Sequence, residues 1–170
     1  MPKLITWCEH NKNWLLAIMA VILIASYTID FLYHSTEVDQ SYYVGCARLI
    51  LEGKYPFVDY NISYPPLVFY IVSIVLRIFP DTVYTHLAVL YAFICADTFI
   101  IYKLAKKINP SPYVSFLTIA YFLFLTIKSR GTMFVLEPFV LFFGLMSLLA
   151  VQSKNKKMLF VAGVSAMCAT

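Results

Sequence analysis

Long apolar segments separated by short charged stretches dominate this chain of 170 residues. Hydrophobic residues make up 61% of the sequence and charged residues only 13%, whereas soluble domains carry about 25% charged residues. The apolar runs cover 14–33, 83–102, 112–127 and 133–151, and a further run begins at 158 and continues to 170. A helix needs about 20 apolar residues to cross the bilayer core. We therefore expect an all-α integral membrane protein with about four complete transmembrane helices and a truncated fifth.

The lysines set the expected orientation. Lys3 and Lys12 precede the first apolar run, and lysine clusters at 103–107 and 154–157 follow the second and fourth runs. Positive charge favours the cytoplasmic side, so the N-terminus and both clusters are expected there, with 34–82 as one outer loop. The apolar segment 66–79 in this loop would be about 21 Å long as a helix, short of the core of about 30 Å. If it crossed, both clusters would lie outside, so we expect it to lie in the outer face.

Two surface helices are expected in the outer loop, at 39–52 and 66–79. Gly53 ends the first, and Ser35 and Thr36 are candidate caps for its start. Polar positions recur at helical spacing along both segments, which favours helices resting on the membrane with the polar side in water. These positions are Ser41, Gly45, Arg48 and Glu52 in the first segment and Tyr70, Ser73 and Arg77 in the second.

Acidic side chains gather in the stretch 37–67 of the outer loop, where Glu37, Asp39, Glu52 and Asp59 are four of the nine acids of the chain. Asp39, at the start of the first surface helix, is the candidate catalytic carboxylate. A helix N-terminus stabilises an anion by about 0.3–1 kcal/mol. The same position suits a simple helix cap, and Asp59, the second candidate, suits a turn residue. The local pattern leaves both alternatives open.

A second group of candidates lies around the short outer turn at 128–132. Lys128 and Arg130 place positive charge in this turn, and Glu137 lies five residues into the next apolar run. An ionised side chain inside the membrane costs several kcal/mol unless it is paired, so Glu137 indicates either a site or a structural ion pair. Asp97 lies in the middle of another run, far from the outer loop, and we interpret it as a packing or partner contact.

Other kinds of site are not indicated by the sequence. The basic residues form no stripe with interleaved aromatic residues, which argues against a nucleic-acid partner. The cysteines and histidines show no spacing typical of metal ligands.

The run EVDQSYYVGCARLILEGKYPFVDYNISYPPL at 37–67 resembles the first outer loop of the GT-C membrane glycosyltransferases. This family includes the protein O-mannosyltransferases and other enzymes that use polyprenyl-phosphate sugars. Its pattern is an acidic residue, then tyrosine and small residues, then Gly-x-x-Pro-Tyr/Phe-x-Asp and Tyr-Pro-Pro-Leu. In this chain the acid is Asp39, the tyrosine is Tyr42, and the two later elements lie at 53–59 and 64–67. The run SRGTMFVLEP at 129–138 is similar to the second outer loop, where an arginine precedes an acid. The resemblance covers about 14–151 and departs from the family at Gln40, where many relatives have a second acid.

The resemblance implies transfer of a sugar, with mannose as one candidate, from a polyprenyl-phosphate donor to a hydroxyl of a protein or glycolipid acceptor. The reaction would invert the sugar carbon on the extracytoplasmic or lumenal side. Asp39 would be the catalytic base, Arg130 or Lys128 would stabilise the leaving phosphate, and Asp59, Tyr64 and Glu137 would bind the substrate. Some relatives hold a divalent metal between their outer acids, but we expect no cofactor here. Because the family's enzymes are several hundred residues long, we expect this chain to be the N-terminal part of a longer enzyme or to need further subunits.

Two other interpretations stay open. A transporter or channel fragment would line a path with polar residues, for which Asp30, His86 and Asp97 are the only candidates. An inactive membrane scaffold would keep the fold without the chemistry, and Gln40 and the short chain favour it. A sugar-transfer assay separates these alternatives.

Overall fold

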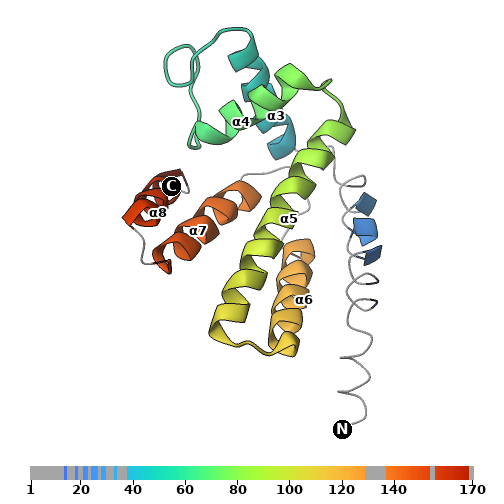
Figure 1. The fold of residues 1–170 in the computed structure, drawn as a ribbon. Helices are drawn as coiled ribbons and strands as arrows, with labels where there is room; N and C mark the ends of the chain where they lie inside the picture. The colour runs from blue at the N-terminus through green and yellow to red at the C-terminus, as the bar shows by residue number, and fades with distance from the viewer. Residues whose placement is uncertain are drawn as a thin grey trace.

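The computed structural model describes residues 38–128, 137–153 and 156–168, together with positions 14, 18, 21–22, 24–26, 28–29 and 33. The three continuous segments are helical and contain no strand, only an isolated bridge between Pro56 and Tyr60, as expected for an all-α chain. Helices α3 and α4 pack together near the N-terminal end of α5, α6 returns beside α5, and α7 and α8 form a second pair (Figure 1). The helices are α3 (Val38–Leu51), α4 (Leu67–Ile78), α5 (Val83–Ile108), α6 (Pro112–Lys128), α7 (Glu137–Val151) and α8 (Lys156–Cys168).

Helix α3 corresponds to the surface helix expected at 39–52. Its expected polar side is exposed at Ser41, Arg48 and Glu52, whereas Tyr43 and Ala47 are buried. Gly53 follows the helix with a φ of 83°, a left-handed conformation that glycine adopts without steric cost. Its amide donates to the carbonyl of Ile50 at 3.0 Å. The sequence pattern therefore predicted which side of this helix is exposed and where the helix ends.

Helix α4 corresponds to the segment expected at 66–79, but its polar stripe is only partly right. Tyr70 and Arg77 are exposed, whereas Ser73 is buried at 4% exposure. The Ser73 hydroxyl donates to the carbonyl of Tyr70 within the same helix at 2.9 Å. A serine satisfied in this way can enter an apolar interface, so its polarity does not indicate a water-facing position.

Helix α5 is the longest of the described helices, and the other helices lie around it (Figure 1). Thr82 caps its start, where the Thr82 hydroxyl accepts a hydrogen bond from the Thr85 amide at 3.3 Å. The helix has 26 residues and ends before Asn109, whose side-chain oxygen accepts from the Ser111 amide at 2.9 Å in the turn to α6. Beside α5, the Tyr91 hydroxyl donates to the Ile24 carbonyl at 2.9 Å, so part of the first apolar run lies along this helix.

The expectation of about four complete transmembrane helices and a truncated fifth is wrong for the residues that the structure describes. Among these residues only α5 is long and apolar enough to cross a membrane. Helices α6, α7 and α8 have 17, 15 and 13 residues, so they extend at most about 26 Å against a core of about 30 Å. Half of the expected span 14–33, and residues 133–136 of the fourth, lie outside the described residues.

The reason for this error is that hydrophobicity and helix length are separate properties. The run at 112–127 forms α6 and most of the run at 133–151 forms α7, but these helices have only 17 and 15 residues. Part of the apolar surface packs against other helices of the same chain, which composition alone does not distinguish from contact with lipid.

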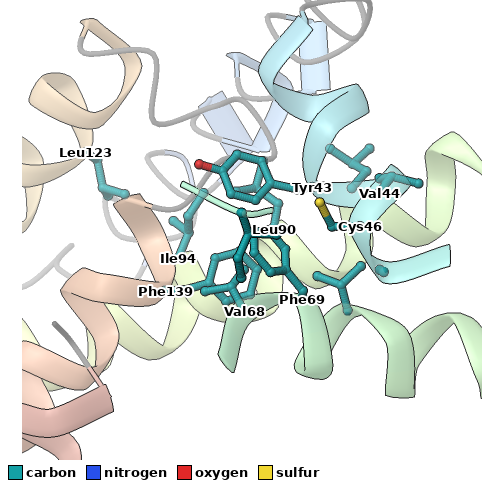
Figure 2. Packing of buried hydrophobic residues seen from close by; sticks show 13 residues of the cluster. Tyr43, Val44, Cys46, Val68, Phe69, Leu90, Ile94, Leu123 and Phe139 are labelled. Atoms are coloured by element: carbon teal, nitrogen blue, oxygen red, sulfur yellow. The ribbon is translucent and has the colours of Figure 1, made fainter. Parts of the chain in front are cut away.

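The core lies where α3, α4, α5, α6 and α7 meet (Figure 2). Phe69 and Leu90 are fully buried there, and Phe139 of α7 is 1% exposed. The ring centroids of Phe139 and of Phe93 in α5 are 4.3 Å apart. One cluster therefore fixes the starts of α3 and α7 near the same part of α5. Its buried members are Tyr43, Val44, Cys46, Ala47, Ile62, Val68, Phe69, Val72, Leu87, Leu90, Ile94, Leu123 and Phe139.

Candidate functional site

The candidate catalytic residue, Asp39, is the second residue of α3. The first turn of a helix carries unpaired amides and a partial positive charge, so an anion there is favoured. Tyr42 and Tyr43 follow Asp39 by one helical turn and lie on the same side of α3. The structure describes the backbone of Asp39 but not its side chain, so its role stays a prediction.

Four aromatic residues, Tyr42, Tyr43, Tyr64 and Phe69, form what we call the aromatic cluster. The ring centroid of Tyr64 lies 6.0 Å from the ring centroid of Tyr42 and 5.6 Å from that of Tyr43. Tyr43 stacks on Phe69 at 5.7 Å. Tyr43 and Phe69 are buried, whereas Tyr64 is 39% exposed. The cluster therefore brings the Tyr-Pro-Pro-Leu segment beside the start of α3 and leaves one aromatic ring open to solvent.

The loop between α3 and α4 folds back along α3. The Tyr60 hydroxyl donates to the carbonyl of Cys46 at 3.2 Å, and the Ser63 amide donates to the Tyr42 hydroxyl at 3.2 Å. Burial raises the pKa of the Tyr60 hydroxyl and the pKa of the Cys46 thiol above their ordinary values. Both side chains are therefore neutral at neutral pH, which suits their place in the packing between the loop and α3. The loop passes Cys46 first and reaches the first turns of α3 at Ser63 and Tyr64.

Asp59 belongs to a tight turn in this loop. Its Oδ2 accepts a hydrogen bond from the Tyr55 amide at 2.7 Å, and its own amide donates to the Tyr55 carbonyl at 2.9 Å. Phe57, at the tip, has a φ of 66°, a conformation that costs a bulky residue energy and needs such bonds to persist. The geometry supports the turn reading of Asp59. The adjacent Tyr60 bonds to α3 at Cys46, about 10 Å along the helix from Asp39, so the structure does not bring the two acids together.

Glu137 begins α7 and is exposed. Phe139, two residues later, packs in the same core cluster as Tyr43 and Phe69. The starts of α3 and α7 therefore approach one another around the core, each with an acid in its first turn. Glu137 is at the helix start rather than inside a membrane-crossing run, so the desolvation argument made from the sequence does not apply to it.

The two candidate cations are not placed by the structure. Arg130 lies outside the described residues. Lys128 is the last residue of α6, and its side chain is not described. Their contact with a phosphate group stays a prediction.

A charged network that the sequence did not reveal joins α3 to the start of α5. The Arg48 Nε–H donates to Asp81 Oδ2 at 2.6 Å, and His86 Nε2 lies 3.0 Å from Asp81 Oδ1. The hydrogen bond from Arg48 holds the pKa of Asp81 below its ordinary value. Arg48 reads as part of the water-facing stripe and His86 as an isolated residue, so only their tertiary contact with Asp81 identifies the network.

The described residues contain no group of three or more histidine, cysteine, aspartate or glutamate side chains placed to hold a metal ion. No protein-family model, curated protein or solved structure matches this chain.

Proposed function

We propose that this chain carries the donor and acceptor site of a membrane glycosyltransferase. The enzyme moves a sugar, with mannose as the first candidate, from a polyprenyl-phosphate donor to an acceptor hydroxyl. The observation that carries the proposal is the placement of Tyr64 beside the first turns of α3, where Asp39 lies. Two motif elements that are far apart in the sequence thereby lie close together, and Phe139, two residues after Glu137 in α7, packs in the same core.

The proposed reaction is a direct displacement at the sugar carbon. Asp39 removes the proton from the acceptor hydroxyl as its oxygen bonds to the sugar carbon, and the bond from that carbon to the lipid phosphate breaks with inversion. The phosphate leaves as an anion, which Arg130 or Lys128 stabilises. Glu137 eases the positive charge that develops on the sugar. We assign Asp59 to the loop turn rather than to the reacting centre.

The orientation of α5 supports an extracytoplasmic or lumenal site. Lys103, Lys106 and Lys107 lie near its C-terminal end, and lysines near the end of a membrane-crossing helix favour the cytoplasm. At the opposite end, Asp81, just before α5, contacts Arg48 of α3, and α3 packs against α4. If α5 crosses the membrane, the α3–α4 unit therefore lies on the outer side.

The surface of α4 supports a lipid-linked donor. The exposed side of α4 carries Tyr70, Ile74 and Ile78 at one-turn spacing, together with the cation Arg77. The exposed side of α3 is polar at Ser41, Arg48 and Glu52. Such a pair suits the membrane surface, with the two isoleucines of α4 against lipid, Arg77 at the level of the head groups and α3 against water. A lipid chain anchored in the membrane would then present its phosphate close to the α3–α4 unit.

The test is transfer of radiolabelled mannose from polyprenyl phosphate to acceptors in membranes that contain the complete protein together with any further subunits. Wild type should transfer sugar above the background of membranes without it, and Asp39→Asn should transfer it about 10²–10⁴-fold more slowly, because a carboxamide cannot accept the proton. Glu52→Gln, a change of an exposed acid on the same helix, is the matched control and should keep wild-type transfer.

Equal transfer by wild type and Asp39→Asn would exclude Asp39 as the base. Absence of transfer by wild type, tested also with glucose and galactose donors, would contradict the proposed function and favour an inactive scaffold.

A further inference from the structure

Asp97 occupies a core position of α5. The buried residues of this helix recur at helical spacing on one side, and Asp97 follows Ile94 by one turn. Ile94 packs in the same cluster as Leu123 of α6 and Phe139 of α7, which Figure 2 shows at one side of the core. Asp97 therefore lies on the side of α5 that packs against other helices. The full buried set is His86, Leu87, Leu90, Ile94, Asp97, Ile100, Leu104 and Ala105.

The carboxyl group of Asp97 has no hydrogen-bond partner among the described residues. Its side chain is 1% exposed, and both carboxylate oxygens are fully buried. The neighbouring Thr98 hydroxyl does not serve it, because it donates to the Ile94 carbonyl at 2.7 Å. The nearest lysine along α5, Lys103, places its Nζ over the Phe99 ring, 4.6 Å from the centroid.

The helices packed against α5 supply no described charge to Asp97. On α7 the only acid is Glu137, which is exposed at the helix start. On α6 the titratable groups with described side chains are Tyr113 and Tyr121, neither of which is charged at neutral pH. On α5 itself, Tyr91 bonds to the first apolar run, and Cys95 is exposed.

An ionised carboxylate in such a place is strongly disfavoured. Removing a charge from water costs several kcal/mol even after relaxation of the protein, and here no described cation or donor offsets this cost. A protonated carboxyl group has no net charge and loses much less on burial. We propose that Asp97 is a proton-binding site, a neutral carboxylic acid in the native fold whose ionisation weakens the packing of α5 against α6 and α7. The proposal does not depend on the proposed glycosyltransferase activity.

The sign of the pH effect follows from the two states of the chain. An aspartate in the unfolded chain loses its proton to water at about pH 4, whereas loss of the proton from folded Asp97 would leave an unpaired charge in the helix interface. The unfolded state therefore binds fewer protons above about pH 4, and stability falls as the pH rises. Asp97→Asn keeps the shape of the neutral acid and removes this titration.

Infrared spectra and thermal unfolding of the purified full chain in detergent test the proposal. At about pH 7 wild type should show the C=O stretch of a protonated carboxyl group, which Asp97→Asn should lack. Between about pH 5 and about pH 9 the thermal midpoint of wild type should fall by at least about 2 °C more than that of Asp97→Asn. Glu52→Gln, which removes an exposed acid, should behave as wild type in both measurements.

Two results would overturn the proposal. One is the absence of a protonated carboxyl band in wild type at about pH 7, which needs no variant. The other is an Asp97→Asn midpoint lowered equally at all pH values, because that result means that an ionised Asp97 is held by a cation or a bound ligand.

Discussion

Gly45 and Gly53, inside and just after α3, have different backbone conformations. Gly45 lies inside the helix, and a Cβ atom added there would have no neighbour within 4 Å. Gly53 lies just after the helix with a φ of 83°, where an L side chain clashes with its own backbone. The same substitution should therefore have opposite effects at the two positions.

Gly45→Ala should raise the free energy of unfolding by up to about 1 kcal/mol, because alanine loses less backbone entropy than glycine in a helix. Gly53→Ala should lower it by about 1 kcal/mol, because the left-handed conformation is strained for alanine. Thermal unfolding of both variants beside wild type measures the difference. Changes of the same sign at both positions would contradict the assigned end of α3.

Two acids of the loop also differ in their surroundings. Asp39 and Asp59 are equivalent in the sequence pattern as carboxylates of one loop, but their surroundings differ. Asp59 is bonded to the Tyr55 amide within its own turn, whereas Asp39 lies at a helix start beside the aromatic cluster. Local sequence left both roles open for each, and the tertiary structure favours the turn role for Asp59 alone.

At the scale of the helices, Asp81 connects α3 to α5. Its carboxylate contacts Arg48 of α3 and His86 of α5 at the same time. This contact orients the α3–α4 unit on the end of the long helix. Since Arg48 is 60% exposed on its side chain, solvent screens the pair, and its contribution to stability is at most about 1 kcal/mol.

Arg48→Met should lower the thermal midpoint above about pH 4 and have little effect in stronger acid. Because the pKa of Asp81 is lowered in the folded state, the contribution of the pair is present above the unfolded pKa and is lost as the pH falls through the folded one. Lys54→Met is the matched control, since Lys54 pairs with Glu52 at 3.4 Å with both side chains exposed, and should change the midpoint less. A difference between Arg48→Met and wild type that persists unchanged in strong acid would show that packing, and not charge, is responsible.

At the scale of the whole molecule, the orientation of α5 relative to a membrane determines which residues lie on each side. It is the one described helix with the length and composition to cross. Lysines lie near its C-terminal end, and the α3–α4 unit lies at its N-terminal end. This arrangement predicts which positions face the outside of the cell or the lumen.

Single cysteines test this orientation in a chain whose own cysteines are replaced by alanine. With an impermeant thiol reagent and intact membranes, Glu52→Cys at the end of α3 should react, and Asn109→Cys at the end of α5 should not. Both positions are exposed in the fold, and both should react after the membrane is dissolved. Reaction at both positions in intact membranes would exclude α5 as a membrane-crossing helix in this orientation.

Sequence alone determined the helical class, the two helices at 39–52 and 66–79 and the water-facing side of α3, because these follow from helical spacing and from a glycine at a helix end. The tertiary structure decided which apolar surface is buried by the chain itself, which helices are too short to cross a membrane and which polar residues meet. Ser73 inside the α4 interface, Asp81 between Arg48 and His86, and Asp97 in the core of α5 all depend on contacts between segments distant in the sequence. Periodicity describes one helix at a time, whereas burial and pairing depend on how several helices pack.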